Sequence, residues 1–242
     1  MSHHWYIRSV VKQNLRTVRR LAKSFGTSPG AMLDGEQFVG GVLVPFVLLD
    51  STLHLVFEKR AENIRQPGEI SFTGGRFDRE LDRSTRDTAV RETVEELGIP
   101  RKRVVAFRRV GTVMTGHAAA VDVYPGILRI ASLSELAPAA AEVAEVFTVP
   151  FSHFVEHDPD RYTVHDEVHS FYTDKDGQEV FTFPARELGL PDRYHRSWGR
   201  REQTVLCYPW EKHQIWGMTA RIIYSLVLSC RCEFKIPTRQ VI

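Results

Sequence analysis

Cysteine is scarce in this chain of 242 residues, and long apolar runs are absent. Cys207, Cys230 and Cys232 are too few for a disulfide scaffold, and the Cys230–Cys232 spacing is too tight for the usual zinc pairings. We therefore expect reduced thiols in a reducing compartment. No stretch approaches the roughly 18 consecutive apolar residues of a membrane-spanning helix. The sequence thus excludes a disulfide-stapled protein and predicts no transmembrane helix.

The composition also lacks any strong bias. Hydrophobic residues make up 43% and charged residues 26% of the chain, both ordinary for a globular protein. A disordered chain and a collagen-like repeat are therefore excluded. The length suits one large domain, or one domain with a small extension, and such a chain can bury roughly 70% of its unfolded surface.

Acidic residues are missing from the first 33 positions, which carry six basic residues. The remainder holds 26 basic and 30 acidic residues, so its net charge is negative. A body of that sign has no general attraction to nucleic acid, and we expect no nucleic-acid partner. The basic residues of the N-terminal segment are Arg8, Lys12, Arg16, Arg19, Arg20 and Lys23.

Residues 5–25 show apolar side chains at steps of three and four, which predicts an amphipathic helix. We assign residues 1–36 to this basic helix and its linker. The simplest interpretation is that its apolar stripe packs on the main domain. The alternatives are a mitochondrial-type presequence or a helix lying on a membrane surface. We expect a cytoplasmic protein without stable membrane insertion, and keep the mitochondrial location as the alternative.

Residues 37–242 are predicted to form one α+β domain. Strands and helices occur without regular alternation, which favours a mixed β-sheet between helices over a doubly wound sheet. Residues 152–205 are polar and rich in turns, so we interpret them as an insertion in this domain. Strands are expected at 42–49, 53–57, 70–72, 104–109, 111–114, 121–130 and 146–149, and the strongest helices at 84–97 and 216–228.

The helix at 84–97 carries an unusual concentration of acid. Glu92, Glu95 and Glu96 occupy neighbouring positions of one helix face, where like charges repel each other. Negative charge is also disfavoured near a helix C-terminus. A divalent cation is the natural compensation, and oxygen ligands at this density suit Mg²⁺ or Mn²⁺ better than zinc. Arg91 lies four residues before Glu95 and is expected to pair with it.

Two adjacent glycines precede this helix. Gly74 and Gly75 allow the backbone to adopt positive φ and to approach a ligand closely. The Gly75 backbone carbonyl is a candidate to complete a metal shell. A solvated helix face would explain the acidic residues alone. The ordered combination of glycine pair, bounded loop and acidic helix favours a site that holds metal ions against a diphosphate.

This combination resembles the signature of the Nudix hydrolases, G-x5-E-x7-R-E-U-x-E-E-x-G-U, where U is apolar. Residues 91–99 read Arg-Glu-Thr-Val-Glu-Glu-Leu-Gly-Ile and fit the second half, with threonine as a weak U. The first half departs, because 16 positions separate Gly75 from Arg91 where the pattern has 14, and its glutamate is absent. Asp82 is the nearest acid to that place, and Glu80 is the alternative. We interpret the loop as expanded.

The flanking sequence resembles the coenzyme A diphosphatase branch of this family. Residues 56–61, Val-Phe-Glu-Lys-Arg-Ala, and 65–75, Arg-Gln-Pro-Gly-Glu-Ile-Ser-Phe-Thr-Gly-Gly, are similar to L-L-T-x-R-[SA], Arg, then G-x3-F-P-G-G. Thr73 replaces the proline, and the interval from arginine to glycine is one residue short. Residues 142–150 and 215–221 also resemble this branch. The resemblance spans about residues 38–228.

The resemblance implies a Nudix fold, a mixed sheet sandwiched between helices, and hydrolysis of a small nucleotide substrate. For coenzyme A or acyl-coenzyme A, the products would be 4′-phosphopantetheine and adenosine 3′,5′-bisphosphate. It also implies Mg²⁺ or Mn²⁺ as cofactor. Glu92 and Glu96 are then the leading metal ligands, with Gly75 in the shell and Glu95 as a third ligand or the residue that orients water.

The resemblance further implies the remaining roles. Glu95 and Glu142 are the candidates for the general base, and Arg91 holds Glu95 in place. Arg60 and Arg65 are candidate phosphate clamps, because a guanidinium group meets phosphate oxygens bidentately. Surface salt bridges are the alternative explanation for these two arginines.

Two other functions remain open at this stage. One is a Nudix enzyme acting on a different nucleoside diphosphate derivative, such as an ADP-sugar, a dinucleotide or a modified nucleoside triphosphate. The other is a non-catalytic Nudix-fold module that binds a ligand. The intact run of acids in residues 91–96 argues against the second, because a binding module can dispense with them. A homodimer is compatible with the sequence.

Overall fold

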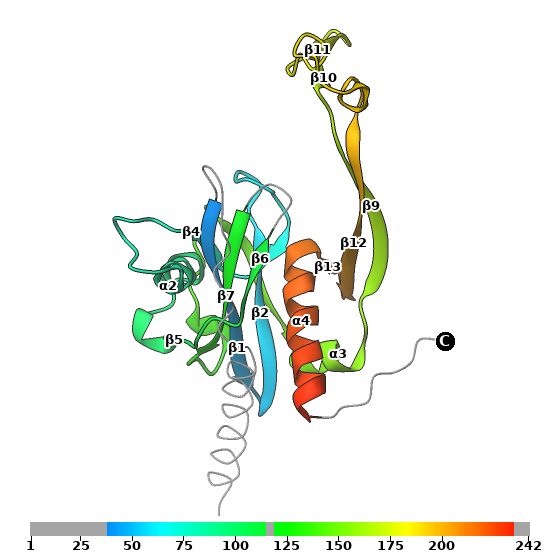
Figure 1. Ribbon diagram of the computed structural model, residues 1–242. Helices are drawn as coiled ribbons and strands as arrows, with labels where there is room; N and C mark the ends of the chain where they lie inside the picture. Colours follow the sequence, from blue (N-terminus) through cyan, green and yellow to red (C-terminus); the bar gives the residue numbers. More distant parts are fainter. Residues whose placement is uncertain (1–37, 115–118, 235–242) are drawn as a thin grey trace, which may run out of the picture. The chain divides into compact units, whose positions relative to one another are not determined.

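The computed structural model describes residues 38–114 and 119–234 (Figure 1). The helix predicted at 5–25 lies outside the described residues. The chain divides into two compact units. The second unit is Asp160–Cys207, and the first holds the described residues before and after it. The bounds of the second unit lie close to the 152–205 insertion proposed from the sequence.

The first unit is built on a mixed sheet that has eight strands among the described residues. β1 and β7 run parallel at its centre, and the other pairs described are antiparallel. The path through the sheet is β3-β2-β1-β7-β5, with β4 on β1, β6 on β7 and β8 on β2. The strands are β1 Phe38–Leu49, β2 Thr52–Arg60, β3 Ile70–Ser71, β4 Gly74–Arg76, β5 Val104–Ala106, β6 Gly111–Met114, β7 Ala119–Leu128 and β8 Val143–Pro150.

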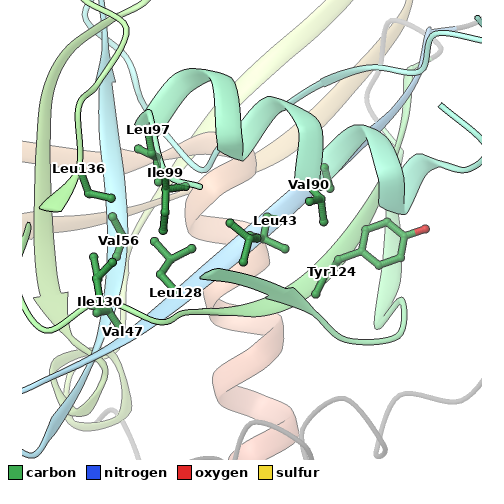
Figure 2. Packing of buried hydrophobic residues seen from close by; sticks show 13 residues of the cluster. Leu43, Val47, Val56, Val90, Leu97, Ile99, Tyr124, Leu128, Ile130 and Leu136 are labelled. Carbon is green, nitrogen blue, oxygen red and sulfur yellow. The ribbon is translucent and has the colours of Figure 1, made fainter. Parts of the chain in front are cut away.

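Helices cover both faces of this sheet (Figure 1). α2 (Thr85–Leu97) lies on one face, where Leu43 and Val90 belong to the same buried cluster (Figure 2). α3 (Phe151–Glu156) and α4 (Gly217–Phe234) lie on the other face, where the rings of Phe46 and Phe151 meet edge to face at 5.4 Å. The predicted mixed sheet between helices is therefore confirmed. Short 3-10 turns follow at η1 Arg101–Arg103 and η2 Leu133–Glu135.

Local sequence signals fix the elements that carry the acidic residues. β1 and β2 form a hairpin whose two turn residues, Asp50 and Ser51, both have positive φ, as a type I′ turn requires. The side chain of Ser84 accepts a hydrogen bond from the Asp87 amide and caps the N-terminus of α2. Gly98 ends the helix in the left-handed region at φ 59°. The predicted start and end of this helix are confirmed.

The second unit is built from β-strands. β9 (Asp160–Val168) pairs antiparallel with β12 (Trp198–Trp210). The last three residues of β12 belong to the first unit, as does β13 (His213–Trp216), the third strand of this sheet. β10 (Phe171–Thr173) and β11 (Glu179–Phe181) form an antiparallel hairpin. A 3-10 turn, η3 (Asp192–Tyr194), completes this unit.

The structure describes the side chains of two of the three cysteines. Cys207 and Cys230 are free thiols, and burial raises the pKa of Cys230 to about 12, so this thiol is not a nucleophile at neutral pH. The side chain of Cys232 lies outside the described part of the chain. Among the helices that the structure describes, none is long and apolar enough to cross a bilayer.

Candidate active site

Four glutamates from three separate segments of the chain act on one another electrostatically. Glu58 lies near the end of β2, Glu92 and Glu96 lie on α2, and Glu142 directly precedes β8. Each of the other three carboxylates disfavours the charged form of Glu96. The structure therefore brings Glu142 together with the acidic helix, although 46 residues separate it from Glu96 in the sequence.

Glu96 is the most perturbed of these groups. Its side chain is buried, with 5% of the residue exposed, and its Oε2 accepts a hydrogen bond of 3.1 Å from the Gly74 amide. Burial, followed by the charges of Glu58 and Glu92, raises the pKa of Glu96 to about 9. A carboxylate at this position is costly until a positive charge arrives to compensate it.

Glu58 was not identified as a site residue from the sequence. Only 2% of it is exposed, and its Oε1 accepts a hydrogen bond of 3.0 Å from the Ser71 hydroxyl. Burial raises its pKa to about 7, and the charges of Glu92 and Glu142 act in the same direction. The sequence carried one signal of this burial, the apolar run that precedes Glu58. An unbroken apolar run predicts a strand that is covered on both faces, and an acid within such a strand is buried as well.

Arg91 connects the acidic residues of the loop and the helix. Its Nε and Nη2 donate to Oδ1 and Oδ2 of Asp82, both at 3.0 Å, in a bidentate pair. Its Nη1 lies 2.8 Å from Glu92 Oε1 and 3.0 Å from Glu95 Oε2. The expected pairing with Glu95 is present. The Glu95 side chain is 54% exposed, so it faces solvent while Glu96 faces the protein interior.

Asp82, and not Glu80, occupies the buried position of the expanded loop. Besides Arg91, it accepts hydrogen bonds from the Thr88 hydroxyl at 2.8 Å and the Asp78 amide at 3.1 Å. These donors, with Arg91 the strongest, hold the pKa of Asp82 near 2. Glu80 is exposed. Asp82 therefore fixes the loop and Arg91 in place.

The glycine pair corrects one expectation. Gly74 and Gly75 do not adopt positive φ; they belong to β4 and pair with β1 through Val42 and Gly41. The second expectation, close approach, agrees with the structure. A Cβ on Gly75 would meet Glu92 Oε1 at 2.3 Å, so the absence of a side chain lets the Glu92 carboxylate lie against the strand.

The two candidate clamps lie at the end of β2. Arg60 Nε donates a 3.0 Å hydrogen bond to the Arg65 backbone carbonyl, which holds the middle of the loop after β2 against the end of that strand. Arg65 is exposed. The Ala61 amide donates to the Glu142 carbonyl at 2.9 Å, so the candidate base and the clamps share one neighbourhood.

A cleft of about 380 Å³ opens beside the acidic helix. It is lined by three arginines and two acidic residues, together with one phenylalanine: Arg76, Phe77, Asp78, Arg79, Arg91 and Glu92. Arginine is the side chain best suited to bind phosphate oxygens. Arg76 and Arg79 were not singled out from the sequence, where they appeared only as part of a charged loop.

The donor set fits a hard divalent cation. Glu58 and Glu96 are buried carboxylates within one electrostatic neighbourhood, and Glu58 Oε2 has no hydrogen-bond partner in the described structure. Within the described ranges, no three acidic, histidine or cysteine side chains already converge as a complete metal cage. Mg²⁺ typically takes only one or two protein carboxylates and completes its shell with water and substrate phosphates. The described arrangement agrees with that mode.

We expect Gly75→Ala to displace the Glu92 carboxylate, because the new methyl group would overlap it. The carboxylate belongs to a flexible side chain, so stability should change little while diphosphate hydrolysis falls about tenfold or more. Gly111→Ala on β6 is the matched control, since a Cβ there meets nothing within 4 Å. Steady-state kinetics and thermal melts of both variants check this. Unchanged kcat/KM in the Gly75 variant would contradict it.

Comparisons with known proteins give relatives across much of the chain. The human mitochondrial coenzyme A diphosphatase NUDT8 is 31% identical over 173 residues, covering 70% of this chain and 67% of the relative. The mouse peroxisomal coenzyme A diphosphatase NUDT7 is 33% identical over 137 residues, and the chain spans only 56% of its length.

A third relative matches over a longer stretch. The uncharacterized Nudix hydrolase NudL of Pectobacterium atrosepticum is 27% identical over 195 residues, covering 80% of this chain and 83% of the relative. No family model matches the chain. The identity to human NUDT8 over two thirds of its length agrees with the acidic helix, the glycine strand and the mixed sheet described above. The chain belongs to the Nudix hydrolase family.

Proposed function

We propose that this protein hydrolyses the diphosphate bond of coenzyme A or acyl-coenzyme A in a metal-dependent reaction. The products would be 4′-phosphopantetheine and adenosine 3′,5′-bisphosphate. The observation that carries the proposal is the buried Glu96 carboxylate, whose pKa is raised by burial and by Glu58 and Glu92, together with the three arginines in the lining of the cleft that Glu92 also lines. This arrangement offers a cation position and a phosphate position side by side. The names of NUDT7 and NUDT8 support the choice of substrate.

The cation in this proposal is Mg²⁺ or Mn²⁺. Glu92 and Glu96 are its leading ligands, with the Gly75 carbonyl and Glu95 as further candidates. When bound, such a cation polarises the diphosphate and lowers the pKa of water. The contribution of the chain is to hold the carboxylates. β4 supplies the Gly74 amide to Glu96, and Arg91 holds Glu92 and Glu95.

Two carboxylates are suited to accept the proton of the attacking water. Glu95 and Glu142 are both exposed, so each can exchange protons with solvent. Different contacts hold the two residues in place. Arg91 fixes the carboxylate of Glu95, whereas the backbone carbonyl of Glu142 accepts a hydrogen bond from Ala61 that anchors its loop. A general base needs reach to water as well as a suitable pKa, and both groups meet the first requirement.

We assign the binding of the substrate phosphates to arginine side chains. Arg60 and Arg65 remain the proposed clamps. Arg76 and Arg79 join them because they line the cleft beside Glu92. A guanidinium group binds phosphate oxygens bidentately and keeps its charge at every relevant pH. Arg91 serves in positioning, since Asp82 already occupies two of its nitrogen atoms.

The substrate is tested by comparing coenzyme A with ADP-ribose under Mg²⁺ and under Mn²⁺. We expect kcat/KM for coenzyme A to exceed that for ADP-ribose by about tenfold or more, because discrimination arises from contacts made to only one substrate. Preference for ADP-ribose would keep the diphosphate chemistry and reject this substrate. Binding of nucleotide without turnover of either compound would favour a binding module.

The compartment and the assembly state are proposals as well. The relatives NUDT7 and NUDT8 are named as peroxisomal and mitochondrial proteins, whereas the composition of this chain favoured the cytoplasm. We propose a cytoplasmic location with the mitochondrial one as alternative. A homodimer remains a prediction from the sequence. A fluorescent fusion of the full chain and its sedimentation profile test these two points.

A further inference from the structure

Glu58 has no role in the function proposed so far, yet it is one of the most buried carboxylates of the molecule. Only 2% of the residue is exposed, although its β2 neighbours Lys59 and Arg60 are half-buried. Its Oε1 accepts one hydrogen bond from Ser71. Its Oε2 is buried and has no hydrogen-bond partner within the described structure.

An unpartnered buried carboxylate oxygen is costly. Leaving a buried polar atom unsatisfied disfavours folding by about 1–3 kcal/mol, and by more when the group is charged. The neighbours increase this cost, because the charges of Glu142 and Glu92 disfavour the charged form of Glu58, and the charge of Glu58 in turn disfavours that of Glu96. The nearby Arg60 directs its Nε to a backbone carbonyl instead. The position thus combines negative charge with an oxygen that lacks a donor.

The fold alone does not require this carboxylate. A neutral side chain at position 58 would accept the Ser71 hydrogen bond equally well. Glutamine would do so without a charge, and threonine is the residue that the branch signature has at this place. What glutamate adds is a charge and the second oxygen, Oε2, which is buried without a hydrogen-bond partner in the described structure.

We propose that Glu58 supplies a further carboxylate oxygen to the cation site, so that strand β2 and helix α2 hold the same divalent cation through Glu58 and Glu96. This inference rests on the proposed function and extends its ligand set. A Mg²⁺ or Mn²⁺ ion prefers hard oxygen ligands, and the protein usually supplies one or two of them as carboxylates. Glu58 suits that role because Ser71 fixes one of its oxygens and leaves the other available.

Glu58 differs from two of the acids identified in the sequence, Glu92 and Glu95. Glu92 and Glu95 are ion-paired with Arg91, which competes with a cation for their oxygens. Glu58 and Glu96 accept only neutral donors, the Ser71 hydroxyl and the Gly74 amide. Neutral hydrogen bonds orient a carboxylate without cancelling its charge, so these two residues offer the stronger attraction to a cation.

The test is direct Mn²⁺ binding to the full-length protein, measured by electron paramagnetic resonance of free Mn²⁺ without substrate. We expect Glu58→Gln to raise the Mn²⁺ Kd by about tenfold or more, as loss of metal-site partners commonly does. Glu58→Thr should show the same loss. Glu62→Gln is the matched control, because Glu62 is exposed at the start of the loop that follows β2 and should keep the wild-type Kd.

Thermal melting separates a ligand from a merely structural residue. Without metal, both Glu58 variants should melt at or above the wild-type temperature, because each removes a buried charge. With saturating Mn²⁺, wild type should gain more in Tm than either variant. Wild-type Mn²⁺ affinity in both variants, or no Mn²⁺ binding by wild type, would overturn the inference.

The same experiment distinguishes this inference from the proposed function. If wild type hydrolyses coenzyme A but the Glu58 variants bind Mn²⁺ normally, the inference fails and the function stands. If Mn²⁺ binding depends on Glu58 while coenzyme A is not hydrolysed, the ligand assignment stands and the substrate is wrong.

Discussion

Replacing Glu96 by glutamine is expected to lower metal-dependent coenzyme A hydrolysis by about a thousandfold or more. The carboxylate is buried, raised in pKa and oriented by the Gly74 amide, so it is the group best placed to meet a cation. Cation stabilisation of a diphosphate transition state is worth several kcal/mol, and each 1.36 kcal/mol changes the rate tenfold. The measurement is kcat/KM at saturating Mg²⁺.

The Glu96→Gln substitution should lower activity but raise thermal stability, so the melting temperature is a second, independent measurement. Glutamine keeps an oxygen for the Gly74 amide but removes a charge that is disfavoured by burial and by Glu58. The metal-free Glu96→Gln protein should therefore melt above wild type. Glu156→Gln, on an exposed position of α3, is the control and should leave activity and Tm unchanged. An inactive variant that also melts below wild type would indicate that Glu96 acts through the fold.

The second large effect is expected at Asp82. Asp82→Asn should lower the free energy of unfolding by about 2 kcal/mol at pH 7, since each pKa unit is worth 1.36 kcal/mol. The pKa of Asp82 falls from 3.8 to about 2 in the folded protein, chiefly through the Arg91 hydrogen bonds. Its stabilising contribution is therefore complete above pH 3.8 and is lost as the pH falls through about 2.

Urea unfolding of wild type and Asp82→Asn across this pH range measures that difference. The gap between the two proteins should be constant from pH 7 down to the unfolded pKa of aspartate and should then close. Glu80→Gln is the control, because Glu80 is exposed in the same loop. A gap that persists unchanged at pH 2, or equal effects of the two substitutions at pH 7, would contradict the assignment of Asp82 to Arg91.

Local features of the site were predictable from the sequence. Helix α2 begins and ends at the residues its capping signals indicate, because Ser84 and Gly98 act within one turn of the chain. The pairing of Arg91 with Glu95 follows from helical spacing alone. The class of fold followed from the mixture of strands and helices without regular alternation.

Features that depend on packing between distant segments were not predictable. Gly74 and Gly75 were expected at positive φ, but their pairing with β1 makes them extended, and such pairing has no local signal. Glu58 was overlooked because its burial depends on the strands on both sides of β2. Sequence spacing could not decide between Asp82 and Glu80, because the decision depends on how the loop folds back onto Arg91.

The most direct test of metal-dependent coenzyme A hydrolysis is product analysis after incubating coenzyme A with wild-type protein, with Mg²⁺ and with a chelator. We expect equal amounts of adenosine 3′,5′-bisphosphate and 4′-phosphopantetheine with Mg²⁺, neither with the chelator, and neither from the Glu96→Gln protein. Intact coenzyme A in every sample, or the same products from wild type and Glu96→Gln, would contradict it.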